Sequence, residues 1–190
     1  MNAIARLCLG VMLLASGCVS ISGEAEPPRA WLTPEIQIEL PPPGIAPSVK
    51  ERQVLTGFFA GKQHSLLVLL DADDRRLSLA GLSPLGIRLF QLSYDSSGIH
   101  TEQFVALPEM PPASQVLMDV MLSYWPQESW ASRLPEGWSL TDGKNRRELR
   151  DFEGRLVATV EFRTEGGKRA PVGVTQHRFD YRIAIERLED

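Results

Sequence analysis

Short runs in which apolar and polar residues alternate fill most of the chain after residue 52, and this period of two constrains the fold more than any other feature. The clearest run is "HRFDYRIAIER", in which Tyr181, Ile183 and Ile185 would face one side and the charged residues the other. Similar runs occupy residues 53–61, 64–72, 75–82, 87–95, 100–107, 146–151 and 155–163, with turn residues between them. The pattern predicts a mainly β fold made of antiparallel strands.

One of these runs, residues 64–72, is apolar on both of its faces. Leu67 and Leu69 would lie on one face, and the alternate residues Leu66, Val68 and Leu70 on the other. A strand of this kind needs cover on both sides. The sequence therefore predicts that another element packs against the sheet here.

Residues 114–126, "SQVLMDVMLSYWP", are expected to provide that cover as a helix with Ser114 as its N-terminal cap and Pro126 as its stop. Its polar positions form only one narrow stripe, made of Gln115, Asp119 and Ser123. A helix so apolar on its remaining faces is buried on most sides. We expect it to lie across the sheet as a lid.

The space between this lid and the sheet is the candidate ligand site. Apolar side chains that line a concave surface form the kind of cavity that accepts acyl or polyene chains. The residues expected to line it are Leu67, Leu69 or their alternates on the strand, and Val116, Leu117, Val120, Met121 and Trp125 on the helix.

The N-terminus has the features of an export signal. Arg6 precedes an apolar run at residues 7–14 that is too short to span a bilayer, and Ala15, Ser16 and Gly17 lead directly into Cys18. This order resembles the bacterial lipobox, so residues 1–17 are interpreted as a lipoprotein signal peptide and Cys18 as the lipidated residue, while a buried cysteine of a plain signal or anchor helix is the alternative. Val19 in the second mature position predicts a lipid anchor in the outer membrane, on its periplasmic face.

Composition and charge limit the partners of the mature chain. Residues 18–48 are rich in proline and predict a semi-rigid tether, part of which packs on the domain formed by residues 49–190. Acidic residues outnumber basic ones, 24 to 20, so there is no basic surface for nucleic acid. We expect a monomer whose partners are the membrane, reached through Cys18, and a hydrophobic ligand or acylated cargo.

The stretch "RRLSLAGLSPLGIRLFQLSYDSSG", followed by a helix that ends in Trp125 and Pro126, resembles the periplasmic lipoprotein carriers of the LolA and LolB type. It is also similar to a lipoprotein family encoded in aryl-polyene biosynthesis clusters, through "GLSPLG.RLF.L.YD" and "YWP". The resemblance implies a half-open antiparallel β-barrel, closed by a helical lid, that holds acyl chains or an aryl-polyene lipid. It also implies that Leu85 is a membrane-insertion residue and that a periplasmic carrier is a partner, although the proline-rich segment stands where LolB has a long N-terminal helix.

The motifs that would indicate catalysis or metal binding are incomplete. Ser83 lies in a near match to a nucleophile elbow, but between two strands instead of before a helix. The three histidines lie in separate runs, and "DADDRR" at residues 71–76 lacks the framework of a calcium loop. Arg146, Arg147 and Arg150 either meet an anionic headgroup or alternate on a solvent-facing strand.

We therefore expect a binding protein with no catalytic residue, no metal and no cofactor. The leading hypothesis is an outer-membrane lipoprotein that binds or transfers an amphiphilic ligand. The alternative is a non-catalytic assembly factor whose apolar groove binds a partner protein.

Replacement of Cys18 by alanine is expected to abolish lipid labelling and outer-membrane attachment, because the thiol is the predicted site of acylation. Metabolic labelling with palmitate, followed by membrane fractionation, measures both effects. Cys8→Ala, inside the predicted signal peptide, is the matched control and keeps the label. A Cys18→Ala chain that is still labelled and still in the outer membrane would rule out the lipoprotein interpretation.

Overall fold

The computed structural model describes residues 27–105 and 111–188. Its elements are β1 (Arg29–Thr33), β2 (Ile36–Glu39), β3 (Val49–Phe59), β4 (Lys62–Ala72), β5 (Leu77–Leu82), β6 (Arg88–Asp95), β7 (Gly98–Gln103), α1 (Ala113–Tyr124), a short 3₁₀ turn at Gln127–Ser129, β8 (Ser139–Asp142), β9 (Arg146–Arg150), β10 (Leu156–Glu165), β11 (Lys168–Gln176) and β12 (Tyr181–Arg187). Two sheets are formed, a β1–β2 hairpin and a ten-stranded antiparallel sheet in the order β7-β6-β5-β4-β3-β12-β11-β10-β9-β8. The predicted mainly β fold is confirmed.

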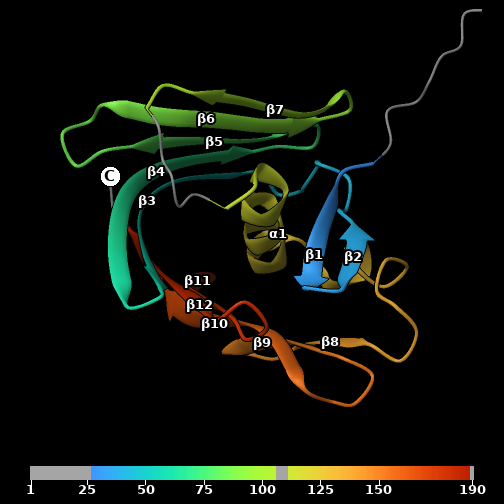
Figure 1. The fold of residues 1–190 in the computed structure, drawn as a ribbon. Coiled ribbons are helices and arrows are strands. Elements are labelled where there is room, and N and C mark those ends of the chain that lie inside the picture. Colours follow the sequence, from blue (N-terminus) through green and yellow to red (C-terminus); the bar gives the residue numbers. More distant parts are fainter. Residues whose placement is uncertain (1–26, 106–110, 189–190) are drawn as a thin grey trace, which may run out of the picture.

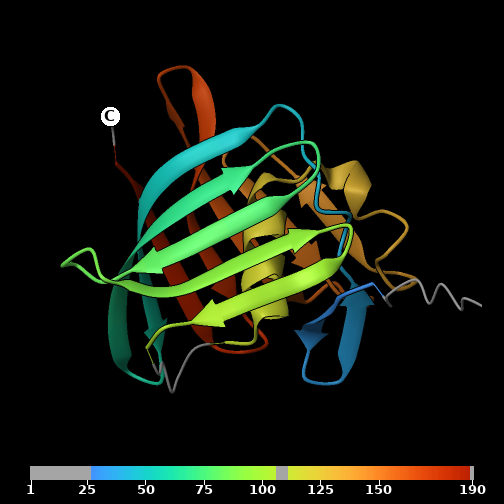
Figure 2. The ribbon, with the colours of Figure 1, turned by 90° about the horizontal axis from the view of Figure 1, so that it is seen from above.

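The large sheet bends around the helix and does not close. Strands β5 to β7 form an upper arm and β8 to β12 a lower arm, and the long strands β3 and β4 curve between them (Figure 1). Helix α1 lies between the two arms, and the view from above shows it behind the upper strands (Figure 2). This arrangement is the half-open barrel with a helix that the sequence predicted.

The alternation of side chains assigns the inner face of the sheet. On β4, Val68 and Leu70 are buried, whereas Leu69 is 38% exposed. Because successive side chains point to opposite faces, Leu67 lies with Leu69 on the outer face. The residues of this strand that face the interior are thus the alternates Leu66, Val68 and Leu70, and not Leu67 and Leu69.

Helix α1 begins one residue before the predicted cap. Pro112, and not Ser114, occupies the capping position, and its carbonyl accepts hydrogen bonds from the amides of Gln115 (2.9 Å) and Val116 (3.1 Å). Proline suits this place because it does not donate and does not need an intrahelical partner. The helix ends at Tyr124, and Trp125 and Pro126 continue as extended chain, so the predicted stop is close to the observed end.

The C-terminal end of the helix is held by an arginine from the lower arm. Arg147 on β9 is only 4% exposed, and its Nη1 donates to the carbonyls of Leu122 (2.7 Å) and Trp125 (2.6 Å). Its Nη2 pairs with Asp142. These carbonyls have no partner within the helix, so the guanidinium both satisfies them and places its charge where the helix dipole is negative. Arg147 is therefore a buried structural residue, which corrects both sequence interpretations of it.

The proline-rich segment is more ordered than a tether from Arg29 onward. Strands β1 and β2 form a hairpin beside the helix, on the side away from the bend in β3 and β4 (Figure 1). Four of its apolar side chains are buried, namely Ala30, Leu32, Ile38 and Leu40. Trp125 Nε1 donates to the Pro42 carbonyl (3.0 Å), and the Tyr94 hydroxyl donates to that of Pro41 (3.1 Å). The part of residues 18–48 that was expected to pack on the domain thus includes this hairpin.

Two strands of the large sheet have no counterpart in the predicted runs. Strand β11 contains Pro171 and Gly173, which are unfavourable in strands. A bulge in β11 lies between them, opposite Glu161 and Phe162 of β10. Strand β8 is only four residues long. The last strand also begins later than expected, because residues 177–180 form a turn in which Asp180 has a φ of 52°.

The expected signal peptide and Cys18 lie outside the described residues. Among the residues that are described, no helix is both long and apolar enough to cross a bilayer.

Candidate functional site

One face of helix α1 remains partly open although it points into the sheet. Val116 and Val120, one helical turn apart, are only half-buried, and we call them the valine face. Tyr124, the next residue in this row, directs its hydroxyl to β3, where it lies 2.5 Å from Gln53 Nε2 and 2.7 Å from Glu51 Oε2. The valine face therefore looks toward the middle strands of the sheet and not toward the outside of the barrel.

The inner face of those middle strands is apolar and also only half-buried. Leu55 on β3 pairs with Leu66 on β4 and with Ile185 on β12, and Ile183 follows on the same face of β12. All four side chains keep intermediate exposure, whereas Val68 and Leu70 farther along β4 are buried. The inner side chains of β5 and β6 are thus covered more completely than those of the bend, whereas most of β7 is exposed. We name the valine face together with Leu55, Leu66, Ile183 and Ile185 the apolar strip.

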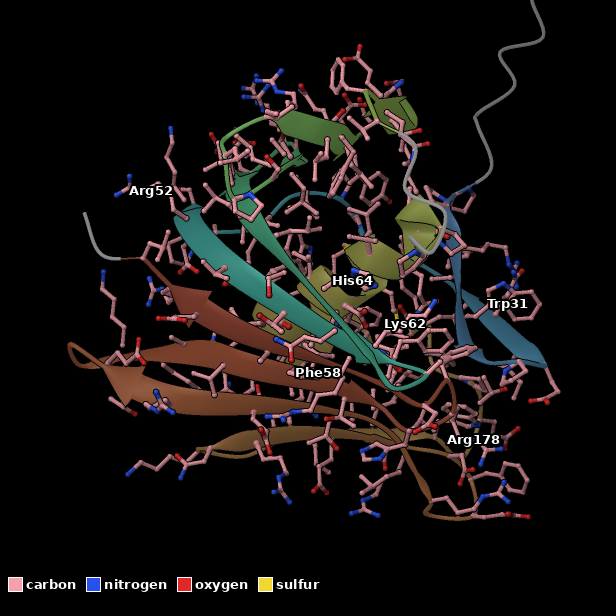
Figure 3. All side chains as sticks on the ribbon, turned by 60° about the vertical axis from the view of Figure 1, so that its left-hand side comes forward. Trp31, Arg52, Phe58, Lys62, His64 and Arg178 are labelled. Atoms are coloured by element: carbon pink, nitrogen blue, oxygen red, sulfur yellow. The ribbon has the colours of Figure 1, made fainter. Side chains whose placement is uncertain are left out.

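Larger and charged side chains continue the inner face toward the tip of the β3–β4 hairpin. Phe59 pairs with Lys62 across the hairpin and with Tyr181 on β12, and His64 pairs with Gly57. Figure 3 shows Lys62 and His64 near this closed end of the hairpin. The strip therefore passes from aliphatic side chains into an aromatic and basic rim.

A buried polar cluster forms one wall beside the strip. Asp119 is 6% exposed and accepts hydrogen bonds from Gln176 Nε2 on β11 (2.6 Å) and from the Tyr181 hydroxyl on β12 (2.6 Å). Gln115 Nε2 lies 3.5 Å from the same hydroxyl. We call Gln115, Asp119, Gln176 and Tyr181 the Asp119 cluster. The polar stripe of the helix therefore points into the interior and fastens the helix to the lower arm.

Burial dominates the electrostatics of this cluster. Removal from water raises the pKa of Asp119 from 3.8 to about 6, although the hydrogen bonds from Tyr181 and Gln176 work in the opposite direction. Burial, together with the neighbouring carboxylate, raises the pKa of Tyr181. The Tyr181 proton is thus retained and available for donation to Asp119.

A second polar cluster joins the other end of the helix to β3. Glu51 Oε2 accepts from Gln53 Nε2 (2.7 Å) and from the Tyr124 hydroxyl (2.7 Å), and Glu51 Oε1 pairs with Arg187 Nη2 on β12 (2.7 Å). We call these four residues the Glu51 cluster. Burial raises the pKa of Tyr124, and the adjacent Glu51 carboxylate adds to the effect. The helix is therefore bonded to the sheet at two points, with the valine face between them.

The predicted cavity residues divide into three groups. Val116 and Val120 belong to the strip, whereas Leu117, Met121 and Trp125 are completely buried in the core. Leu67 and Leu69 lie on the outer face, as described above, and their place is taken by Leu66. The sequence could not choose between the two faces because five consecutive aliphatic residues, 66–70, carry no alternation.

The sequence identified Gln115 and Asp119 as a polar stripe but missed their partner Gln176 on β11, and it also missed Gln53 of the Glu51 cluster. Gln53 and Gln176 both occupy inner positions of strands. The alternation in residues 53–61 could have indicated that Gln53 is buried, because it falls on the same face as apolar residues of that run. Gln176 lies at the end of β11, a strand that was not predicted at all.

Leu85 lies at the tip of the β5–β6 loop and is 87% exposed. The loop protrudes from the body of the protein at the left of Figure 2. Ser83 Oγ accepts hydrogen bonds from the amides of Leu85 (3.3 Å) and Ile87 (3.2 Å), and Gly86 has a φ of 78°, which favours glycine. The hydroxyl of Ser83 therefore shapes this loop.

Other exposed apolar residues lie near the base of the same loop. Ile87 precedes β6, and Phe104 follows β7 with its amide bonded to the Leu89 carbonyl (2.9 Å). The guanidinium of Arg88 lies 5.9 Å from the centre of the Phe104 ring. With Val105, these residues extend the apolar surface, and we call Leu85, Ile87, Phe104 and Val105 the apolar tip.

Two surface hollows lie apart from the strip. One, of about 550 Å³, is lined by residues 143–146, 161–163 and 172 on the lower arm. The other, of about 600 Å³, is formed by residues 42–46 with Asp74, Arg75 and Ser96. Within the described ranges, no group of three histidine, aspartate or glutamate side chains could hold a metal ion.

Asp119 is expected to make stability fall as the pH rises from about 4 to 6. The folded protein keeps the Asp119 proton up to about pH 6, whereas the unfolded chain releases it near 3.8. The contribution is therefore fully present below pH 4 and lost above pH 6, by at most about 3 kcal/mol. Urea unfolding of the wild type and of Asp119→Asn at pH 4, 5, 6 and 7 measures the free energy of unfolding at each pH. The fall in this free energy between pH 4 and 6 should be smaller in the variant.

Asp95, which is only partly buried, provides the control. Hydrogen bonds from Ser97 lower its pKa, so Asp95→Asn should leave the loss of stability between pH 4 and 6 unchanged. Identical pH profiles for the wild type and Asp119→Asn would show that burial does not shift this carboxyl.

Comparison with known proteins places this chain in a family. No curated protein matches its sequence. A solved structure of a DUF1329 family protein from Desulfovibrio piger is similar at 11% identity over 74% of this chain and 83% of that chain, with a TM-score of 0.33. That likeness is too distant to carry an argument. The family described as "Protein of unknown function (DUF3261)" matches residues 50–189, which include every strand of the large sheet and the helix, and the chain therefore belongs to this family.

Proposed function

We propose that this protein binds a hydrophobic or amphiphilic ligand, such as an acylated cargo or an aryl-polyene lipid, along the apolar strip. The observation that supports this proposal most directly is the incomplete burial of aliphatic side chains on two facing surfaces inside the barrel. Apolar side chains on an inner face are normally covered by their own protein. A ligand chain between Val120 and Leu55 would remove the remaining surface from water, at about 25 cal/mol for each Å².

The positions of the polar clusters fit an elongated ligand. The Asp119 cluster and the Glu51 cluster hold the helix at two levels, between residues 115 and 124. The nine helical steps between these residues span about 13.5 Å at about 1.5 Å each, so the strip beside them has room for an extended chain. The helix is thereby kept in place while the strip beside it stays open.

The half-open sheet around a helix agrees with the resemblance to the LolA and LolB type of carrier. In this proposal, lipidated Cys18 attaches the protein to the outer membrane on its periplasmic face. The apolar tip, with Leu85 at its end, enters the bilayer and delivers the ligand. Exposed apolar side chains at a protruding loop need a partner of this kind, because contact with water is unfavourable for them.

Replacement of Val120 by aspartate is expected to weaken ligand binding at least tenfold, because it places a charge in the apolar strip. The probe is a dansyl-labelled long-chain alcohol, titrated into the domain from about residue 24 onward while its fluorescence is followed. Leu69→Asp, an equivalent change on the outer face, is the matched control and should bind as the wild type does. If the wild type does not bind this neutral probe, the carrier proposal is wrong, and an assembly factor whose groove holds a partner protein becomes the better hypothesis.

Replacement of Leu85 by glutamate is expected to impair delivery and not folding. The Leu85 side chain is almost completely exposed, so the thermal unfolding temperature of the variant protein should differ from that of the wild type by less than about 2 °C. Transfer of the same probe to phospholipid vesicles should slow several-fold, because a carboxylate does not enter the acyl region. Gln63→Glu, on the outer face of β4, serves as the control. Unchanged transfer by Leu85→Glu would contradict a role in membrane insertion.

A further inference from the structure

The Asp119 cluster contains a buried hydrogen-bond acceptor without a partner. Gln115 is 6% exposed, and its Oε1 atom has no hydrogen-bond partner in the described part of the protein. Polar atoms removed from water are almost always paired. Such an atom beside a candidate ligand site therefore needs an explanation.

The hydrogen-bond network fixes which way the Gln115 amide points. The Tyr181 hydroxyl has a single proton, which it donates to Asp119 Oδ2 at 2.6 Å. It can then only accept from Gln115, so the Nε2 group of Gln115 faces the hydroxyl. A reversed amide would place two acceptors against each other. The Oε1 atom must consequently lie on the other side of the amide, away from Tyr181.

The neighbouring residues connect this atom with the apolar strip. Gln115 precedes Val116 of the valine face, and on β12 Tyr181 lies two positions from Ile183, on the same side of the strand. The free acceptor thus belongs to the N-terminal end of the helix, where the strip meets the polar cluster. An acyl chain lying in the strip would place its polar head at one of the two ends.

We infer that the ligand of this site carries an uncharged hydrogen-bond donor, a hydroxyl or an amide N–H, that binds Gln115 Oε1. This inference rests on the proposed function and specifies its substrate class. An anionic head is unfavourable, because the carboxyl group of Asp119 shares Tyr181 with Gln115 and two like charges in a buried site repel each other. The network therefore selects neutral amphiphiles over fatty acids or phosphates.

Photo-crosslinking of the full chain in isolated membranes tests this selection. The two probes are a hexadecanol that carries a diazirine and an alkyne on its chain, and the methyl ether of the same molecule, which has lost only the donor. The wild type should be labelled about tenfold more by the alcohol, the ratio that corresponds to one additional hydrogen bond in an apolar site. The two probes partition differently into the membrane, but this difference is the same for every variant. It therefore cancels when the ratios of labelling are compared between variants.

Gln115→Met retains the length of the side chain and removes the acceptor, so its ratio of labelling should fall to about one. Gln63→Met on the outer face is the matched control and should keep the ratio of the wild type. Tyr181→Phe is a second variant that leaves Gln115 in place but frees its amide to reverse. The amide can then donate to the ether as readily as it accepts from the alcohol, and the ratio should again approach one.

The outcomes separate this inference from the function on which it rests. Equal labelling of the wild type by both probes, as expected if an internal water occupies Gln115 Oε1, would overturn the inference and leave the binding function intact. A preference that persists in Gln115→Met would overturn it as well. Absence of labelling by either probe would contradict the proposed function itself.

Discussion

Burial of a helix inside a curved sheet is the constraint on which the rest of this structure depends. A helix placed there must find partners for its terminal carbonyls and for every polar side chain, because water does not reach them. Arg147 supplies the partner for the carbonyls, and Gln176 and Tyr181 supply the partners for Asp119. All three come from the lower arm, so the position of the helix is set mainly by polar contacts with that arm and by apolar packing on the other sides.

These contacts also account for the open strip. The helix is held toward β11 by the Asp119 cluster and toward the β1–β2 hairpin by buried side chains such as Leu32. The bend of β3 and β4 is joined to the helix by hydrogen bonds through Tyr124. The valine face and the opposing Leu55 and Leu66 are consequently only half-buried. In the proposed function, this incompletely buried surface is the place of the ligand.

Much of the architecture follows from local patterns. The alternation from Tyr181 to Ile185 and the single apolar segment before Pro126 predicted strands and a helix that the structure contains. Elements whose stability comes from their neighbours were missed. Strand β11 includes Pro171 and exists because β10 and β12 pair with it on both sides, and the β1–β2 hairpin is ordered by the helix on which it packs.

The sequence by itself determined which residues are apolar and where the helix and most strands of the large sheet occur, but it left the exposure of Leu85 open. Only the tertiary structure decided which side of each element faces the interior. Residues 66–70 are equally apolar on both faces, so their orientation depends on the register with β3, and the stripe of Asp119 is polar yet buried because partners from β11 and β12 reach it. Both decisions rest on contacts between residues distant in the chain, 57 positions apart for Asp119 and Gln176, and no local pattern encodes such contacts.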